Sequence, residues 1–330
     1  MTPVKRILKI VAAVLGLALV FGVGFVRLPY YAVGPGPANE VIPLIRVGGG
    51  QPTYPPSGKL IMTTVSFYQV TPLEALRAWL DPHESIVAED VLYPPGVDHA
   101  TEDQRSRSQM DQSKIDAAVV VLTELEDYPK SHGPGALIEQ SFPGCPADGE
   151  LFSGDLIVSI DGETVDSRTD ASKLLGDVPA REPIDFRVRA AGETHDVEVA
   201  KRPCGGSKEP LVGISLVDNF PFPIVIASGN VGGPSAGLMF SLGLYDLLTR
   251  GDLTSGRTIA GTGTIAADGT VGPIGGIIDK VVAAQRVGAS VFLVPKQNMA
   301  ELQGVDTGDM RLIPVGTFDD AVSALQRTAS

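Results

Sequence analysis

Histidine is scarce in this chain of 330 residues, and its positions exclude one familiar way of activating a serine. The only four are His83, His99, His132 and His195, and all precede the serine of "GNVGGPSAGLMFSLG" (229–243). That serine, Ser235, has the G-x-S-x-G spacing of a nucleophile on a strand-to-helix turn, a setting in which the histidine base follows the serine. The histidines also lie in polar, loop-like surroundings or in a separate β-rich segment, which argues against a histidine base of another chain order.

Cysteine and positive charge are also in short supply. The two cysteines, Cys145 and Cys204, have a spacing that matches no metal site, and the net charge is −13. A surface that binds nucleic acid needs the opposite sign of charge. We therefore expect no metal, no cofactor and no nucleic-acid partner. The cysteines form a disulfide if they lie in an oxidising compartment, or else remain two separate buried thiols.

One long apolar run stands near the N-terminus. Lys5, Arg6 and Lys9 precede the run Ile10–Val26, and the pair Tyr30–Tyr31 follows it. The run is long enough to span a bilayer as a helix, the basic flank favours the cytoplasmic side, and tyrosines suit the opposite interface. It is long for a secretory signal, the alternative, and no A-x-A-like cleavage site follows. We expect an uncleaved signal anchor over residues 1–30 in the cell membrane, with the catalytic part outside.

The segments after this run differ in composition. Glycine and proline in "VGPGPANEV" and "GGGQPTYPPSG" predict a linker over 31–57. Apolar and β-branched residues predict a strand near 60–65, and Thr71 is an expected N-cap with proline at the first helical position. Apolar residues at helical spacing predict a second amphipathic helix; they are Met110, Ile115, Ala118, Val119 and Leu122.

The segment Gly133–Arg202 alternates short β-like runs with glycine turns. Its "PA…GDLI…IDGETV" pattern, from Pro146 to Val165, resembles a PDZ domain. The resemblance implies peptide binding by strand addition. It places the groove between the strand Ala136–Gln140 and a helix near Ala171–Leu175, with backbone N–H groups offered by the loop His132–Gly135. The implied peptide-binding residues are Gly133, Gly135, Ala136, Leu137 and Ile138.

Lysine is the other side chain that can take the proton of a serine. It must be neutral to do so, and burial among apolar groups lowers its pKa. Only Lys280 and Lys296 follow Ser235. Lys280 lies in the apolar, helix-like run "IGGIIDKVVAA", whereas Lys296 follows a proline at an exposed-looking strand end. The pattern favours Lys280 as the base.

Two motifs then resemble the proteolytic domain of Lon-type proteases, over 223–315. "GGPSAG" matches the nucleophile motif and "TIAGTGTIAADGTVGPIGGIIDKVVAA" the block with the general base. The resemblance implies a Ser235–Lys280 dyad with Thr262 beside the lysine. For the oxyanion, the N–H groups at Gly232, Gly233 and Ser235 are candidates, since Pro234 has none and a helix is expected to begin at Ser235.

These observations give one architecture. We expect an α+β protein, with a Lon-type proteolytic domain over 58–130 and 205–327, an inserted PDZ-like domain over 133–202, and one transmembrane helix before them. The sequence contains no G-x-x-x-x-G-K-[ST] phosphate loop, so the expected activity is ATP-independent endopeptidase cleavage of proteins or peptides. By analogy, the Lon-type domain suggests a homo-oligomeric ring. The alternatives are a catalytically silent PDZ scaffold and an esterase or amidase for small molecules.

Overall fold

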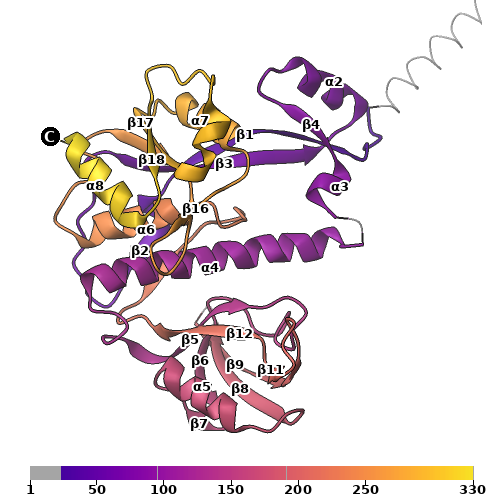
Figure 1. Cartoon of the computed structure of the whole chain (residues 1–330), viewed down its shortest axis with the longest axis vertical. Helices are drawn as coiled ribbons and strands as arrows, with labels where there is room; N and C mark the ends of the chain where they lie inside the picture. The colour runs from indigo at the N-terminus through magenta and orange to yellow at the C-terminus, as the bar shows by residue number, and fades with distance from the viewer. Residues whose placement is uncertain (1–23, 95, 191, 330) are drawn as a thin grey trace, which may run out of the picture.

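A computed structural model describes residues 24–94, 96–190 and 192–329 (Figure 1). Most of the apolar run Ile10–Val26 therefore lies outside the described residues, and the predicted anchor with it. Within the described part of the chain, no helix is both long and apolar enough to cross a membrane.

One of two six-stranded sheets, called the larger sheet because its strands together contain more residues, combines strands from both ends of the chain. Its order is β18-β17-β14-β3-β1-β4, with β3, β14, β17 and β18 parallel to one another and β1 antiparallel to both β3 and β4. The strands are β1 (Tyr30–Glu40), β3 (Lys59–Gln69), β4 (Ser85–Ala88), β14 (Thr258–Gly261), β17 (Val291–Pro295) and β18 (Arg311–Val315). All residues of β17 are buried, as expected for a parallel strand covered on both faces.

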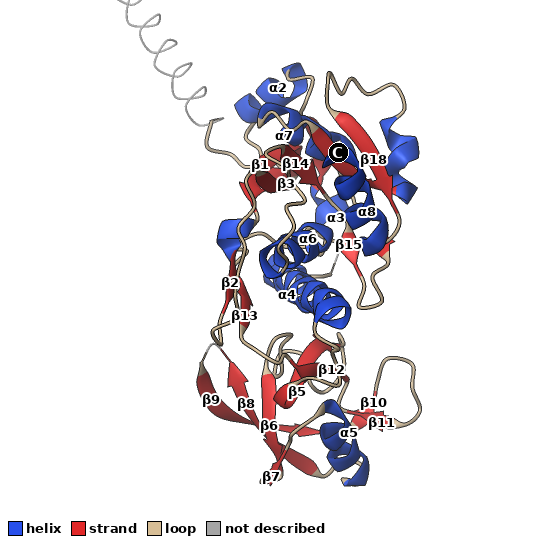
Figure 2. Cartoon of the chain, turned by 90° about the vertical axis from the view of Figure 1, so that its left-hand side faces the viewer, coloured by secondary structure: helices blue, strands red, loops and turns tan. Residues whose placement is uncertain are grey.

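Helices cover both faces of this sheet. Successive residues of a strand point to opposite faces and so pack against different helices. Leu60 and Met62 join a core with α4 (His99–Leu125), α6 (Gly237–Leu248) and α8 (Phe318–Ala329). Ile61, between them, joins the core of α7 (Ile277–Arg286) on the other face. The alternation follows from the two-residue period of a strand (Figures 1 and 2).

The prediction of a linker over 31–57 is wrong. Residues 30–40 form β1, which pairs with β3 along its length but with β4 only over 30–33. Pro35 and Pro37 therefore lie where one edge of β1 is open, the position in a sheet that tolerates proline, and the register with β3 shifts between Pro35 and Ala38. Further on, η1 (Ile42–Leu44) leads into β2 (Ile45–Val47), which pairs with β13 (Ile224–Ile226).

Both helices expected in this first part of the chain are present. The helix α2 (Pro72–Leu80) begins with a capping box, in which Thr71 and Glu74 bond to each other's backbone N–H. The helix α4 runs beneath the larger sheet and is capped by Asp98. Four further short elements accompany the larger sheet: α3 (Glu89–Leu92) from the first part of the chain, and β15 (Thr264–Ile265), β16 (Val271–Gly272) and η2 (Lys296–Leu302) from the last part.

A second sheet forms a separate layer on the other side of α4 (Figures 1 and 2). Its order is β12-β5-β6-β8-β9, and β7 pairs with β6. The strands are β5 (Gly133–Ser141), β6 (Leu156–Ile160), β7 (Glu163–Thr164), β8 (Pro183–Ala190), β9 (Glu193–Ala200) and β12 (Ile214–Asn219). The helix α5 (Arg168–Asp177) packs on it, and a small core containing Phe186 and Ile138 lies between them.

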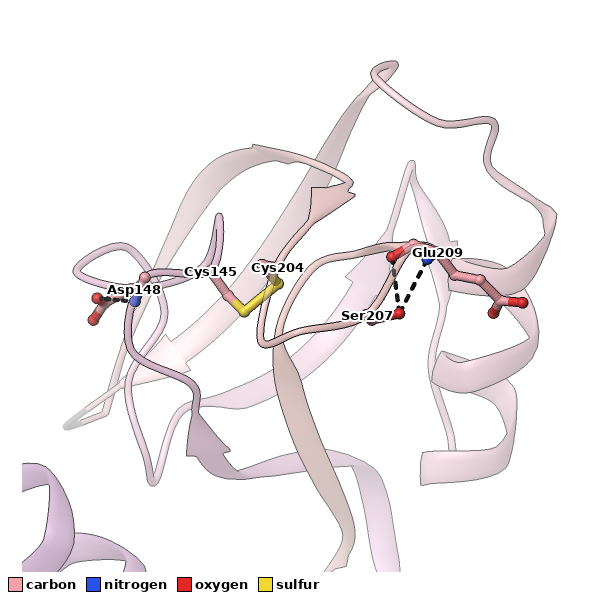
Figure 3. Close-up of a disulfide and its surroundings, with 6 residues drawn as sticks. Cys145, Asp148, Cys204, Ser207 and Glu209 are labelled. Carbon is pink, nitrogen blue, oxygen red and sulfur yellow. Dashed lines mark hydrogen bonds between the residues drawn. A yellow bond between two sulfur atoms is a disulfide. The ribbon is translucent and has the colours of Figure 1, made fainter.

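Residues 205–219, assigned from the sequence to the catalytic part, lie with the second sheet and supply its strand β12. The strand β12 pairs with β5. The hairpin of β10 (Arg202–Pro203) and β11 (Pro210–Leu211) lies between β9 and β12 in the chain and connects these two strands. A disulfide joins Cys145 to Cys204 beside this hairpin, whose loop is closed by hydrogen bonds between Ser207 and Glu209 (Figure 3). The predicted boundaries at 202 and 205 are therefore too early, because the pairing of β12 with a strand more than 70 residues upstream leaves no local signal in the sequence.

Candidate active site

Ser235 and Lys280 meet beside Thr262, the residue that follows the central strand β14. Lys280 Nζ lies 2.6 Å from Ser235 Oγ, although the residues are 45 positions apart. Ser235 sits in the turn before α6, and Lys280 in the first turns of α7. Ile277, Val281 and Ala284, at spacings of four and three, anchor α7 to the sheet and direct Lys280 inward, where it is 3% exposed.

The burial of Lys280 changes its acidity. Loss of solvent lowers the pKa of Lys280 from 10.5 to about 8. Burial disfavours the charged form, so a substantial fraction of the amine is neutral near pH 8. A neutral amine beside a serine hydroxyl can accept its proton.

Thr262 completes the arrangement. Its hydroxyl donates to the carbonyl oxygen of Ser235 at 3.0 Å, and its Oγ1 lies 3.1 Å from Lys280 Nζ. Because the hydroxyl proton is directed to the carbonyl, the oxygen of fully buried Thr262 can accept from the lysine. Thr262 thus holds both the serine backbone and the ammonium form of the base.

The loop before Ser235 rests on α4. The Gly233 N–H donates to the carbonyl oxygen of Ser106 at 2.8 Å, and Ser113 Oγ donates to the carbonyl oxygen of Pro234 at 2.9 Å. A Cβ on Gly232 would collide with Ser106 Oγ, so glycine permits this close approach. The sequence did not indicate Ser106 and Ser113 as site residues; small side chains seven positions apart on an amphipathic helix are the only local sign of the contact.

These contacts correct two expectations. Gly233 is not available as an oxyanion donor, because Ser106 already accepts its N–H. The helix α6 begins at Gly237 and not at Ser235, whose carbonyl oxygen is tied to the Gly263 N–H at 2.9 Å. The N–H groups of Gly232 and Ser235 have no acceptor among the described residues, which leaves them able to bind an oxyanion.

The other candidate bases lie elsewhere. Lys296 is exposed and forms an ion pair with Asp320, Nζ to Oδ2 at 2.8 Å. His99 contacts Glu89, and His132 contacts the neighbouring carbonyl of Gly133. In the described ranges, no group of three or more histidine, cysteine or acidic residues is placed to hold a metal ion.

The structure contradicts the peptide-binding groove that the sequence predicted beside β5, because both edges of β5 are already paired. Gly133, Ala136, Leu137 and Ile138 pair with β12, and Ala136 and Leu137 pair with β6 on the other side. A strand paired on both sides cannot accept a further one. The N–H of Gly135 is also taken, by the carbonyl oxygen of Asp166.

The strand β12 is one of the two edge strands of the second sheet, and a groove runs between β12 and α5. The groove has a volume of about 880 Å³ and is lined by residues of α5, of β12 and of the loop between β11 and β12. The N–H groups of Val212 and Gly213 in that loop have no acceptor among the described residues. Gly213 has φ +88°, and a Cβ there would collide with Cys145, so the disulfide-bonded turn shapes the loop. The sequence "LVGISL" at 211–216, a glycine between apolar residues, is the local pattern that could have indicated this loop.

Comparisons with known proteins bear on the catalytic part. Residues 221–327 match the Lon protease (S16) C-terminal proteolytic domain. Lon protease 1 of Myxococcus xanthus is 34% identical over 112 residues, which are 32% of this chain and 14% of that protein. Lon protease 2 of Bacillus subtilis is 34% identical over 108 residues, 32% of this chain and 18% of that protein. The chain thus spans less than a fifth of these relatives. The matched region, which carries Ser235, Thr262 and Lys280, is a serine-peptidase domain similar to that of Lon proteases.

Two solved structures are similar to about a quarter of this chain. The PDZ domain of an SdrC-like protein from Listeria innocua is 20% identical, covers 25% of this chain and 92% of its own, and has a TM-score of 0.23. The PDZ domain of an SdrC-like protein from Listeria monocytogenes is also 20% identical, covers 26% of this chain and 88% of its own, and has a TM-score of 0.24.

Proposed function

We propose that this protein is a membrane-anchored serine endopeptidase that needs no ATP and cleaves polypeptides with a Ser235–Lys280 dyad. The observation that carries the proposal is the 2.6 Å approach of Lys280 Nζ to Ser235 Oγ inside a region that matches a Lon proteolytic domain. Lys280 is buried and has a lowered pKa, as a lysine base requires.

The reaction follows from the contacts. Neutral Lys280 accepts the Ser235 hydroxyl proton while Oγ attacks the peptide carbonyl, and the N–H groups of Ser235 and Gly232 stabilise the negative oxygen. The ammonium of Lys280, held by Thr262 Oγ1, then protonates the leaving amine. Water then gives one proton to the regenerated amine while its oxygen attacks the acyl carbon. Collapse of the second tetrahedral species breaks the bond to Oγ and releases the carboxylic acid, and the ammonium of Lys280 returns its proton to Ser235.

Substrate capture is assigned to the second sheet. A peptide would add as a strand along the open edge of β12, beside α5. The free N–H groups of Val212 and Gly213 are suited to a peptide carboxylate. Lys201 also lines the groove and adds positive charge, and its Nζ is fixed by the carbonyl oxygen of Leu175 at 2.7 Å.

The topology is part of the proposal. The basic flank at Lys5, Arg6 and Lys9 favours a cytoplasmic N-terminus, with the rest of the chain outside. The disulfide between Cys145 and Cys204 is consistent with an oxidising compartment. Protease shaving of intact cells should remove an epitope placed at the C-terminal Ser330, and an epitope that stays protected until lysis would contradict this topology.

The test of the chemistry uses purified full-length protein and a peptide library without nucleotide. We expect Ser235→Ala and Lys280→Arg to lower cleavage more than about 1000-fold, the latter because arginine keeps its proton. Lys296→Arg, an exposed lysine changed in the same way, is the matched control and should retain activity. Cleavage by the unaltered protein should rise about tenfold per pH unit and level off near pH 8, as the amine of Lys280 deprotonates.

Three results would contradict the proposal. Full activity of Lys280→Arg would remove the dyad. Binding of peptides along β12 with no cleavage by the unaltered protein would favour a silent scaffold, and cleavage of small esters but not peptides would favour an esterase.

A further inference from the structure

The short helix α2 has an inverted distribution of apolar side chains. Its buried residue is Ala78, which packs with Ala32 and Val70 in a small cluster that Ala75 and Leu28 border. The large apolar residues point outward instead; Leu73 is 70% exposed, Leu76 52%, Trp79 74% and Leu80 69%. A helix on a soluble surface usually buries its large residues, so this outer face is an unpartnered apolar surface.

This face lies where the apolar N-terminal run ends. Arg27 directly follows the run Ile10–Val26. Its Nη1 donates to the Gln69 carbonyl oxygen at 2.6 Å and forms an ion pair with Glu74 of α2 at 3.0 Å. The Leu28 N–H donates to the Val70 carbonyl oxygen at 2.8 Å, one residue before the N-cap of α2. The start of α2 is therefore fixed to the residue at which the apolar run leaves off.

The surroundings of α2 leave its outer face accessible. The helix stands with β4 and α3 at the far ends of β1 and β3, away from the other helices of the larger sheet (Figure 1). The second sheet lies at the opposite end of the molecule, beyond α4. Within the described residues, nothing packs on the outer side of Leu73, Leu76 and Trp79, given their exposure.

We propose that the outer face of α2, formed by Leu73, Leu76, Trp79 and Leu80, lies in the headgroup region of the lipid bilayer that the N-terminal run enters. The inference rests on the membrane anchor proposed above. If the run spans the bilayer, Arg27 is at its surface, and the ion pair between Arg27 and Glu74 holds α2 there. Leucine and tryptophan on one face of a short helix suit that depth.

The charge balance indicates which kind of attraction holds the helix. The chain carries a net charge of −13, so attraction to anionic lipids is not the driving force. Glu74 is paired with Arg27, which leaves the outer face with little uncompensated charge apart from Arg77. Burial of apolar surface in a neutral lipid layer is then the favourable term. Two points of attachment, the run and α2, would fix the orientation of the molecule and direct the groove along β12 away from the membrane.

The single tryptophan of the chain makes this testable without a label, because Trp79 is the only one. Full-length protein is reconstituted in nanodiscs of phosphatidylcholine with or without bromine on the acyl chains near the headgroup. We expect brominated lipid to quench the Trp79 emission and the disc to protect it from acrylamide. The double variant Leu73→Ser, Leu76→Ser should lose most of both effects. Val225→Ser, an exposed apolar residue on β13 far from α2, is the matched control and should keep them.

The outcomes separate the parts of the proposal. Incorporation into discs with Trp79 quenched by acrylamide and not by bromine would overturn the docking of α2 and leave the anchor intact. Emission protected from both quenchers, and dependent on protein concentration, would show a second copy on this face and would also overturn it. Failure of the chain to enter discs at all would overturn both the anchor and the docking. Peptide cleavage measured on the same samples reports on the Ser235 chemistry independently.

Discussion

The two sheets of this molecule use the chain in opposite ways. The second-sheet region, residues 133–219, is one continuous stretch, and its first and last strands are neighbours, with Gly133 opposite Asn219. The catalytic region, residues 24–132 and 220–329, is divided by that stretch. Its central pair, β3 and β14, joins residues about 200 positions apart, and its site depends on α4 from one segment and on α6 and α7 from the other. A contiguous region can be removed or exchanged, whereas a divided one requires both segments.

The largest effect should come from deletions that follow this difference. Replacing 133–219 with a short linker between residues 132 and 220 should leave a folded catalytic region that still cleaves small peptides, because the two ends are adjacent. Removing 24–132 instead should abolish folding, since β14 would lose its partner β3. Circular dichroism and calorimetry would measure both. The 133–219 deletion exposes Ile115 and Val119 of α4, so a lower unfolding temperature is expected, but loss of cooperative unfolding would refute the division.

The disulfide should matter for one region only. The bridge between Cys145 and Cys204 closes a loop of 59 residues inside the second-sheet region. Chain entropy then predicts that Cys145→Ser with Cys204→Ser lowers the stability of that region by about 4 kcal/mol. Calorimetry should show an earlier transition for the second-sheet region, while cleavage of small peptides changes little. Reductant should reproduce the shift in the unaltered protein and have no effect on the double variant. If the double variant also lost most of its cleavage of small peptides, the two regions would not be separable.

Adding a single methyl group should test the close contact between the catalytic loop and α4. Gly232→Ala places a Cβ against Ser106 Oγ, and a displacement of about 1 Å in a catalytic loop costs about 100-fold in rate. Gly176→Ala on α5, where a Cβ meets nothing, is the matched control. Adding Ser106→Ala to Gly232→Ala removes the colliding oxygen and should restore part of the kcat. Absence of any rescue would assign the loss to another cause.

The smallest effect should appear at the contact between the regions. Asp116 of α4 is buried, its Oδ1 has no hydrogen-bond partner among the described residues, and Glu139 of β5 is close. Burial first, and then the charge of Glu139, raise the pKa of Asp116 to about 8 from 3.8. The folded state therefore binds more protons than the unfolded state between these values, so stability falls as pH rises from about 4 to 8.

Asp116→Asn should remove part of this pH dependence and stabilise the protein at pH 8. Melting temperatures measured across that range would show it, with Asp111→Asn, an exposed carboxylate on the same helix, as the control. A parallel shift of the variant at every pH would show that titration of Asp116 is not the cause.

Local patterns in the sequence were enough to predict that Ser235 and Lys280 lie together. The motif around Ser235, and the apolar period that directs Lys280 inward, are each contained in one short segment. The capping box of Thr71 and Glu74 is local for the same reason. The strand β1 was missed because Pro35 and Pro37 are normally strand breakers, and only the open edge beside β4 makes them acceptable.

Contacts between distant segments account for the other errors. The pairing of β12 with β5 moved the groove from one strand to another, and the bond from Gly233 to Ser106 removed an oxyanion donor. Both depend on residues more than 70 positions apart, and no periodicity within a segment encodes such a partner. The disulfide between Cys145 and Cys204 is non-local too, and composition alone left it open.

The buried amine at the site has a consequence for inhibitor selectivity. Reagents that inactivate serine peptidases by alkylating an imidazole have no target here, because no histidine hydrogen-bonds to Ser235 or Lys280 among the described residues. Electrophiles that form a reversible adduct with Ser235 Oγ, such as boronic acids, need only the serine and the oxyanion donors. A small aldehyde that reaches the 3% exposed amine of Lys280 in its neutral form could condense with it. Inhibitors of this site would therefore combine a serine-directed group with an amine-directed one, a pairing that a histidine-based peptidase would not recognise.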